Sequence, residues 1–287
     1  MTSKPPAACC STGHEHFGTP TGAIIQIPDT TISAYLATPA SSGVTTVKDK
    51  VLAILFIPDI LGLHNNNKLL ADRFAAAGYL TLLVDIFNGD PFPLRKPFAI
   101  LGPTDDLTQD WAAHGSDGKN PHTTAEVDPI VRSAIAYLRS EHHGITRLGA
   151  VGYCVGVKSL VRFLDAGKAK IDVGFGAHPS YVTDEELWAS RGPLSIAAAG
   201  ERDLIFTNEL RHQTEEILRK KGEVWSIALY SGVSHGFAVR GDPGSEEDKW
   251  AMDEAYEQAL TGAITPSVVS PNHQFFLTAG DNGYVKV

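Results

Sequence analysis

Short apolar runs alternate with segments of helical periodicity along most of this sequence. The apolar runs predict strands at residues 51–57, 79–84, 148–153, 171–177, 194–199 and 224–230. Apolar positions three and four residues apart predict helices at about residues 65–77, 124–143, 207–221 and 245–260. Strands that are apolar along their whole length belong in a parallel sheet covered on both faces. The pattern therefore predicts an α/β fold with a mostly parallel, doubly wound sheet and helices on both faces.

Both ends of the chain depart from this alternation. The first 20 residues are rich in Pro, Ser, Thr and Gly, which is typical of an irregular arm. Runs at 23–27 and 32–38 predict an antiparallel hairpin at a sheet edge. Aromatic residues near the C-terminus, among them Phe275, Phe276 and Tyr284, hint at a homodimer. We expect three segments: an N-terminal arm (1–20), a single α/β domain (21–262) and a C-terminal tail (263–287).

Composition and charge narrow the class of protein. Hydrophobic residues make up 43% and charged residues 20% of the 287 positions, as in ordinary globular proteins. A net charge of −9 disfavours nucleic acid and anionic membrane as partners. No apolar run approaches the roughly 20 residues of a membrane span, and the first residues lack the apolar core of a secretory signal. We therefore predict a cytoplasmic protein.

Cysteine usage supports the same compartment. Three cysteines, Cys9, Cys10 and Cys154, build no disulfide framework, which is typical of a reducing environment. Cys9 and Cys10 are adjacent, but His14 and His16 are the only other ligand types nearby. We therefore predict no metal site.

One short stretch carries the strongest signal for chemistry. Residues 152–156 read Gly-Tyr-Cys-Val-Gly, between an apolar strand and the start of a helix. The related G-x-S-x-G pattern is the nucleophile elbow of α/β-hydrolases, whose tight turn needs glycines. A thiol at Cys154 would lie at a helix N-terminus, which favours the thiolate, and the Val155 N–H would face a developing oxyanion. The alternative is that Cys154 is a small buried hydrophobe beside closely packed glycines.

Polar residues follow most of the predicted strands. In a doubly wound sheet, chemistry collects at the carboxyl ends of the strands. Asp203 follows the second-to-last predicted strand, and His235 follows the last one. This is the order, acid then histidine, expected of an α/β-hydrolase. His235 would exchange a proton with the thiol, and Asp203 would orient its imidazole. His178 is a rival base that precedes the acid, and we interpret it as a pocket residue. Taken singly, Asp203 could be a helix cap and His235 a loop histidine.

At these residues the sequence resembles the dienelactone hydrolase family, particularly its fungal branch. The resemblance covers about residues 18–260, with the elbow, the segments at 201–203 and 234–237, and the loop at 87–91 as specific points. It implies an α/β-hydrolase that opens lactones and esters without a cofactor. It also implies roles for residues by position: Cys154 as nucleophile, His235 as base, Asp203 as orienting acid, and the backbone N–H groups of Ile60 and Val155 as the oxyanion hole.

The sequence departs from the bacterial members at the substrate side. Asp59 stands where those members have a glutamate that holds the resting thiol, and Asn88 stands in place of one substrate-binding arginine. Arg240 lies near the position of the second arginine, with a shifted spacing. The residues predicted to contact substrate are Asp59, Phe87, Asn88, His178, Tyr181, Phe237 and Arg240.

Three functions are compatible with these observations. The leading hypothesis is a cysteine hydrolase acting on a lactone, ester or cyclic anhydride of a small organic molecule. The second is a tailoring enzyme of secondary metabolism that isomerises, cyclises or decarboxylates in the same pocket, shaped by Trp111 and His114 of the insertion after residue 91. The third is a non-catalytic binding protein on a hydrolase scaffold. Product mass separates the first two, because hydrolysis adds one water.

Overall fold

A single mixed sheet organises the computed structural model, which describes residues 1–40, 46–47, 50–94, 108–140, 144–165 and 171–264. The order along the sheet is β1-β2-β5-β4-β6-β7-β8-β9, and β3 pairs with β4. The first three strands in this order pair antiparallel, and the pairs from β5–β4 to β8–β9 are parallel. The strands are β1 (Ala23–Gln26), β2 (Ser33–Ala37), β3 (Thr46–Val47), β4 (Lys50–Ile57), β5 (Leu80–Val84), β6 (Ile145–Tyr153), β7 (Val173–Ala177), β8 (Leu194–Ala199) and β9 (Trp225–Tyr230).

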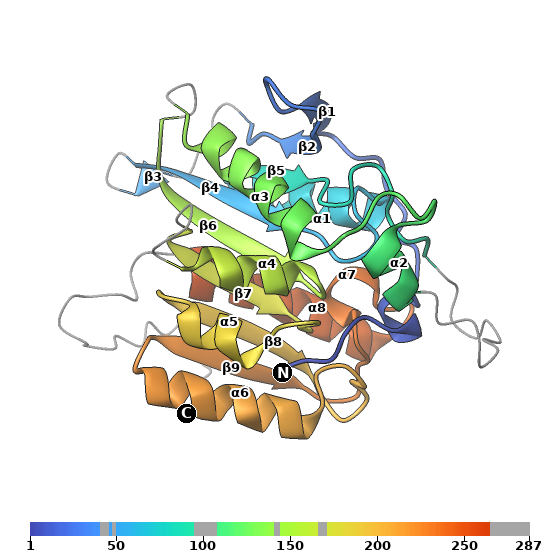
Figure 1. Cartoon of the computed structure of the whole chain (residues 1–287). Helices are drawn as coiled ribbons and strands as arrows, with labels where there is room; N and C mark the ends of the chain where they lie inside the picture. Colours follow the sequence, from blue (N-terminus) through green and yellow to red (C-terminus); the bar gives the residue numbers. More distant parts are fainter. Residues whose placement is uncertain (41–45, 48–49, 95–107, 141–143, 166–170, 265–287) are drawn as a thin grey trace.

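Helices cover the sheet on both faces (Figure 1). The helices are η1 (Ala8–Cys10), α1 (Asn65–Ala76), α2 (Thr108–His114), α3 (Thr124–Leu138), α4 (Gly156–Phe163), α5 (Asp184–Ala189), α6 (Asn208–Lys221), α7 (Phe237–Arg240), α8 (Glu246–Gln258) and η2 (Ala259–Ile264). Apolar side chains of α3, α4, α5 and α6 belong to one core cluster, whereas those of α1, α7 and α8 belong to a second. The sheet separates the two clusters.

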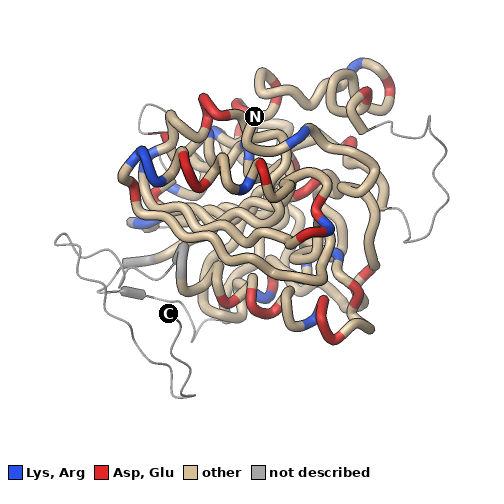
Figure 2. Tube along the Cα trace, turned by 90° about the horizontal axis from the view of Figure 1, so that it is seen from below, with Lys and Arg blue, Asp and Glu red and all other residues tan. Residues whose placement is uncertain are grey.

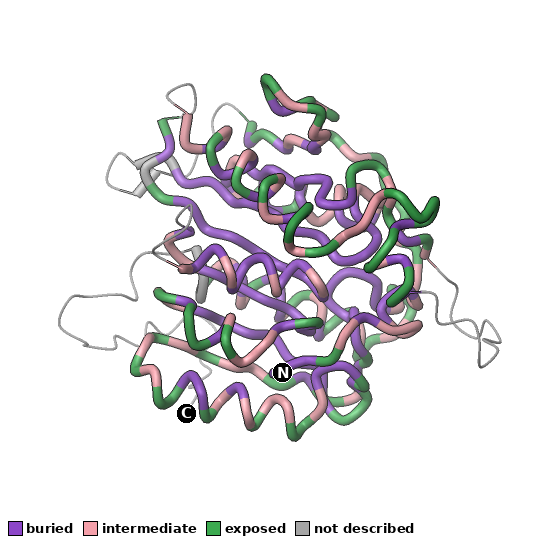
Figure 3. The backbone as a smooth tube through the Cα atoms, in the orientation of Figure 1, coloured by how far each residue is buried: buried purple, intermediate pink, exposed green. Residues whose placement is uncertain are grey.

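The central strand β4 explains why the buried strands are apolar throughout. Successive side chains of a strand point to opposite faces, so a sheet with two covered faces buries every position. Ala53, Leu55 and Ile57 belong to the cluster under α3 and α4. Leu52, Ile54 and Phe56 belong to the cluster under α1 and α8. Figure 3 shows the same burial along the neighbouring strands.

The predicted fold class is confirmed, and so is the antiparallel hairpin at one sheet edge. Three short helices were missed: α5 and α7 follow strand ends, and α2 lies in the predicted insertion. The predicted helix to residue 143 ends at Leu138, and residues 141–143 lie outside the described part. The predicted tail lies almost wholly outside it as well, because description stops at residue 264.

Charged residues lie mainly on the outer helices and loops, and the central strands carry few (Figure 2). Within the described residues, none of the helices combines the length and the apolar character that a membrane crossing requires.

The arm of residues 1–20 packs onto the body although little of it is regular. The backbone N–H groups of Thr2 and Ser3 donate to the carbonyl of Val182 at 3.0 and 3.2 Å. The terminal ammonium lies 2.8 Å from Asp184. Further along the arm, Cys10 is fully buried. The arm is therefore part of the wall at the carboxyl end of the sheet.

Candidate active site

The predicted elbow joins β6 to α4 through a strained turn. Cys154 has a φ of +52°, a left-handed conformation that costs a non-glycine residue roughly 1 to 2 kcal/mol. Its N–H donates to the carbonyl of Ala177, and its carbonyl accepts from Ser180, both at 3.1 Å. A Cβ at Gly156 would overlap the carbonyl oxygens of Ile57 and Pro58. Close backbone approach therefore requires this glycine, and the flanking hydrogen bonds hold the turn.

Cys154, His235 and Asp203 form a continuous chain of contacts. Nε2 of His235 lies 3.2 Å from the Cys154 sulfur. Nδ1 of the same ring lies 3.1 Å from each carboxylate oxygen of Asp203. The Asp203 Oδ1 atom also accepts from the N–H groups of Ile205 and Phe206, at 2.8 and 2.9 Å. The carboxylate is thus fixed by backbone and can orient the imidazole toward the thiol.

Electrostatics hold the His235–Asp203 pair in its charged form. Burial alone lowers the pKa of His235, but the Asp203 carboxylate outweighs it and raises that pKa well above 6.5. Burial alone raises the pKa of Asp203, but the charge and hydrogen bond of His235 bring it below 3.8. The side chains are 1% and 0% exposed, so little solvent screens the pair. This arrangement suits an imidazole that accepts and returns a proton.

A second buried ion pair joins Asp59 to Arg240. Nη1 of Arg240 donates to Oδ2 of Asp59. The side chain of Arg240 is 1% exposed and that of Asp59 is 0% exposed. Oδ1 of Asp59 accepts from Asn67 at 3.0 Å and from the Leu61 N–H at 3.2 Å. A Cβ at Gly236, whose φ is +91°, would overlap the guanidinium. The pair therefore occupies a site shaped to hold it.

The N-terminal arm completes the bonding of Arg240. Its Nε donates to the carbonyl of Thr12 at 3.0 Å, and its Nη2 donates to the carbonyl of Cys9 at 3.5 Å. Each guanidinium nitrogen thus has a partner. Both side chains of this pair, which the sequence predicted to contact substrate, are buried and already bonded. The sequence left open whether Asp59 reaches the resting thiol; in the structure the Cys154 sulfur pairs with His235, and Asp59 pairs with Arg240.

His178 packs behind the catalytic histidine candidate. Its ring centroid lies 5.1 Å from that of His235 and 5.7 Å from that of Phe237, both edge to face. Burial, with the charges of His235 and Arg240, lowers the pKa of His178 well below 6.5. Neither ring nitrogen has a hydrogen-bond partner among the described residues. A neutral imidazole there supports the ring of His235 without adding charge.

A cavity of about 480 Å³ opens beside the elbow. Its walls come from the arm, the loop after β5, helix α2, the start of α3 and the elbow helix. Lining residues with aromatic or polar side chains are Phe87, Gln109, Trp111, His122, Thr123, Thr124, Lys158, Ser159, Tyr181 and Glu186. Val155, which follows Cys154, is also on the wall. The volume is that of a site for a small organic molecule.

Aromatic packing shapes the far wall of this cavity. The ring centroids of Trp111 and His122 are 4.5 Å apart, and those of Phe87 and Trp111 are 4.9 Å apart. Nε2 of His122 lies 3.1 Å from Oδ2 of Asp90. Burial lowers the pKa of His122 despite this neighbour. The wall therefore presents apolar faces with one oriented imidazole.

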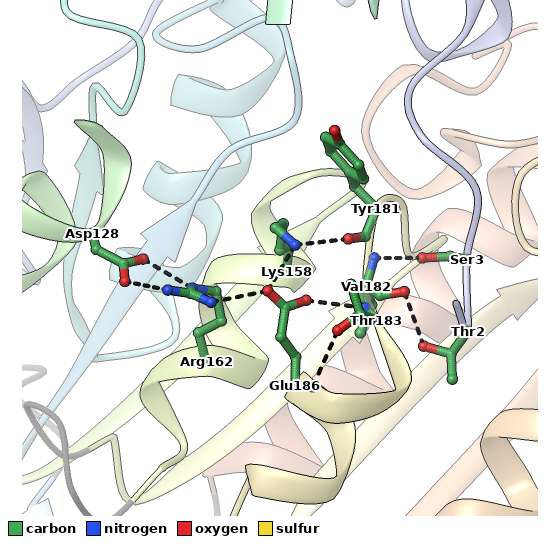
Figure 4. A network of polar contacts seen from close by, with 9 residues as sticks. All are labelled: Thr2, Ser3, Asp128, Lys158, Arg162, Tyr181, Val182, Thr183 and Glu186. Atoms are coloured by element: carbon green, nitrogen blue, oxygen red, sulfur yellow. Dashed lines mark hydrogen bonds and ion pairs between the residues drawn. The ribbon is translucent and has the colours of Figure 1, made fainter. Parts of the chain in front are cut away.

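A polar network ties the near wall to the arm (Figure 4). Lys158 of α4 donates to Glu186 at 2.7 Å and to the carbonyl of Tyr181 at 3.0 Å. The neighbouring Val182 N–H donates to Oγ of Ser3 at 2.9 Å. Because the positive charge of Lys158 is already paired with Glu186, the cavity presents no free arginine or lysine to a substrate anion among its described lining residues.

The predicted substrate contacts fall into two groups. Phe87 and Tyr181 line the cavity. His178, Phe237, Asp59 and Arg240 are buried and are not among its lining residues. Asn88 is exposed and does not line it either, because its φ of +52° carries it into the turn after Phe87. Whether any of them binds substrate stays a prediction.

Sequence reasoning missed three features of this region. Trp111 lines the cavity as expected of the insertion, but His114 is exposed and His122 takes the place on the wall. Pro5 and Pro6 of the arm also line it. Cys10 lies beside Cys154 and His235, and all three ligand atoms are within 4.8 Å of one another. No local pattern links Cys10 to the elbow, because the arm reaches it only through the fold.

The parallel sheet, the helices on both faces and the strand-turn-helix elbow define an α/β-hydrolase. The model of the dienelactone hydrolase family matches residues 32–262. The chain belongs to this family and is a hydrolase. The family predicted from the elbow and its partner segments is therefore confirmed.

Similar proteins agree with this assignment. The chain is 41% identical to Hydrolase tropI of Talaromyces stipitatus, over 91% of this chain and 96% of that protein. It is 32% identical to Dienlactone hydrolase 1 of Gibberella moniliformis, over 90% and 92% of the two chains. The solved structure of a candidate dienelactone hydrolase from Klebsiella pneumoniae matches with a TM-score of 0.63 at 15% identity, covering 84% of this chain and 97% of that one. The last comparison shows the fold.

Proposed function

We propose that this hydrolase opens a lactone, ester or cyclic anhydride of a small organic molecule by covalent catalysis at Cys154. The observation that carries the proposal is the unbroken chain of contacts from the Cys154 sulfur through His235 to Asp203. Nucleophile, base and orienting acid in contact are the arrangement that covalent acyl transfer requires.

The chemistry has two halves. With the Cys154 proton held on Nε2 of the charged His235, the sulfur attacks the substrate carbonyl as a thiolate, and the carbonyl oxygen becomes an oxyanion. When the oxyanion collapses, the carbon–oxygen bond to the leaving group breaks, and His235 returns the proton to that oxygen, which is an alkoxide for a lactone or ester and a carboxylate for an anhydride. Water then attacks the thioester with His235 as base, which releases the carboxylic acid and restores the thiol. The net change is the addition of one water.

Two backbone N–H groups support this pathway. No described residue accepts a hydrogen bond from the N–H of Ile60 or of Val155. Val155 lines the cavity, and Ile60 lies in the turn after β4, which is the neighbour of β6 in the sheet. Donors held ready for a developing oxyanion are worth about 3 kcal/mol of transition-state stabilisation each. We assign the oxyanion hole to these two groups.

The cavity also supports a class of substrate. Its walls combine Trp111, Phe87 and Tyr181 with a cation that is already paired. We therefore propose a small, flat, largely apolar substrate, without a carboxylate that the enzyme must grip. The homodimer and the cytoplasmic location remain predictions from the sequence.

Product mass tests the proposal. Wild type, Cys154→Ala and the control Cys9→Ser are incubated with lactones, cyclic anhydrides and aryl esters in water enriched in oxygen-18. We expect products heavier by one water, with one labelled oxygen, from wild type and Cys9→Ser. A thioester adduct on Cys154 should be seen by intact mass after rapid acid quenching. Full turnover by Cys154→Ala would contradict the mechanism. A product of unchanged mass would instead favour a tailoring reaction in the same cavity.

A further inference from the structure

Three potential metal ligands from distant parts of the chain meet at the elbow. The sulfur atoms of Cys10 and Cys154 and a ring nitrogen of His235 all lie within 4.8 Å of one another, and all three residues are buried. Cys10 comes from η1 of the arm, Cys154 from the turn after β6, and His235 from the loop after β9. Two thiols and one imidazole are ligand types that four-coordinate Zn²⁺ prefers.

The separations suit a tetrahedral ion. Bonds of about 2.3 Å to sulfur and about 2.0 Å to nitrogen place the ligand atoms of such a site roughly 3.6 to 3.8 Å apart. The Cys154 sulfur and Nε2 of His235 are 3.2 Å apart, and no pair exceeds 4.8 Å. Small side-chain rotations therefore suffice to bring the three atoms around one ion.

The histidine is already oriented as a metal ligand would be. Histidine ligands commonly donate their second ring N–H to a carboxylate, which fixes the tautomer and strengthens the metal bond. Nδ1 of His235 lies 3.1 Å from both oxygens of Asp203, and Nε2 points to the thiols. The contact that would orient the ring in catalysis thus also prepares Nε2 for a metal.

The arm holds Cys10 in place from both sides. The Cys10 N–H donates to the carbonyl of Ala7 at 2.8 Å. After η1, Nε of Arg240 donates to the carbonyl of Thr12 at 3.0 Å. Before it, Thr2 and Ser3 bond to Val182. These contacts hold the arm on the body through atoms other than the three ligands, so binding need not order the arm.

We propose that Cys10, Cys154 and His235 form a binding site for one Zn²⁺ ion, or another divalent ion with the same preference for sulfur. Binding releases the proton of Cys10 and the proton that Cys154 and His235 share, so that both sulfurs and the freed lone pair on Nε2 of His235 bond to the ion. A water or small anion takes the fourth position. The bound ion occupies Cys154 and His235 and so blocks hydrolysis. Ion binding stands by itself, whereas this inhibition rests on the proposed function.

Cobalt binding tests the site without any assay of activity. Wild type, Cys10→Ser and Cys9→Ser are titrated with Co²⁺ under anaerobic conditions with a phosphine reductant. We expect one equivalent to produce sulfur-to-cobalt charge-transfer absorption and tetrahedral visible bands, both displaced by Zn²⁺. Cys10→Ser should bind at least about tenfold more weakly and lose part of the charge-transfer band. Cys9→Ser should match wild type. Equal spectra for Cys10→Ser and wild type would overturn the proposal.

Alkylation and inhibition provide a second measurement on the same proteins. Zn²⁺ should protect Cys10 and Cys154 together from a thiol reagent, as mapped by peptide mass. Zn²⁺ should inhibit ester turnover by wild type and Cys9→Ser, and a chelator should reverse this inhibition. Inhibition of Cys10→Ser should require at least about tenfold more Zn²⁺. Protection of Cys154 alone would contradict a site that includes Cys10. Cobalt binding in a protein without esterase activity would keep the metal site and reject the proposed function.

Discussion

Two buried carboxylate–cation pairs lie at the carboxyl end of the sheet, and they differ in what the cation of each pair contacts besides its carboxylate. In the first, Asp203 holds one nitrogen of His235 while the other nitrogen reaches the Cys154 sulfur. In the second, every nitrogen of Arg240 has a partner: Asp59 and two carbonyls of the arm. Burial and charge are alike in the two pairs. A ring nitrogen that faces the Cys154 sulfur makes the first suited to chemistry, and a guanidinium bonded at each nitrogen makes the second suited to holding the arm on the body.

The two cations are close in the sequence but serve different sites. His235 directly precedes Gly236, and Arg240 is the last residue of the single turn of α7 that follows. The left-handed conformation of Gly236 turns the chain there, and its missing side chain leaves room for the guanidinium. One glycine thus lets a short segment supply the ring beside the nucleophile and the anchor of the arm.

The largest expected effect comes from Asp203→Asn. The amide keeps the size of the carboxylate but loses its charge, so His235 is left without its orienting acceptor. We expect kcat to fall by about 10⁴-fold with the fold retained. Steady-state kinetics measure kcat, and circular dichroism checks that the fold is retained. Asp59→Asn is the matched control in the other pair, and its kcat should fall far less. Similar losses in both variants would remove the distinction between the pairs.

Arg240→Met should produce the next largest effect, on stability. It leaves the Asp59 carboxylate buried without its cation, and such a loss costs about 3 to 5 kcal/mol. Urea unfolding measures the difference in the free energy of unfolding. The double variant Asp59→Asn/Arg240→Met should recover part of it, because no uncompensated charge remains. Additive losses in the double variant would mean that the pair is not coupled.

The pH dependence of stability distinguishes the pairs further. His235, with its raised pKa, contributes stability that is present below 6.5 and is lost as the pH rises through its folded-state pKa. Asp203, with its lowered pKa, contributes stability that is present above 3.8 and is lost as the pH falls through its folded-state pKa. The gap in the free energy of unfolding between wild type and Asp203→Asn should therefore be widest between these limits.

Urea unfolding of both proteins at several pH values checks this expectation. On the alkaline side the gap should narrow for Asp203→Asn but stay constant for Arg240→Met, because an arginine keeps its charge there. A gap for Asp203→Asn that does not change with pH would show that His235 does not titrate against Asp203.

Most of the fold could be predicted because its signals are local. Strands buried on both faces must be apolar at every position, so β4 and β6 stand out in the sequence. The elbow was equally predictable, since Gly156 is required by the close approach of two backbone carbonyls. The order of Asp203 and His235 along the chain then indicated which polar residues would meet Cys154.

The rest depends on contacts that leave no local pattern. Arg240 and Asp59 are 181 positions apart, and their pairing follows from how α7 packs against the loop after β4. Family resemblance placed Arg240 near a substrate-binding arginine, with a shifted spacing, whereas in the structure it donates to Asp59 and to carbonyls of the arm. Cys10 likewise reaches the elbow through the arm. Resemblance to relatives located the elbow residues, but it could not show which buried cations were already bonded.

The smallest expected effect comes from an ion pair nearer the surface. Nε of Arg162 in α4 donates to Asp128, and Nη1 donates to Glu186, both at 3.0 Å. The three side chains are 10 to 19% exposed. Water and salt screen such a pair, so Arg162→Gln should cost only about 1 kcal/mol.

Salt separates this pair from the buried one. Raising the ionic strength should shrink the cost of Arg162→Gln, because partly exposed charges are screened, and should leave the cost of Arg240→Met nearly unchanged. Both follow from urea unfolding at low and high salt. Lys249→Gln, which removes an exposed partner of Glu246, serves as the control for a change of surface charge alone. Suppose instead that Arg162→Gln lowered the free energy of unfolding as much as Arg240→Met. Burial would then not be what makes the Asp59–Arg240 pair an anchor of the arm, and only the bonds from Arg240 to the arm carbonyls would distinguish the two pairs.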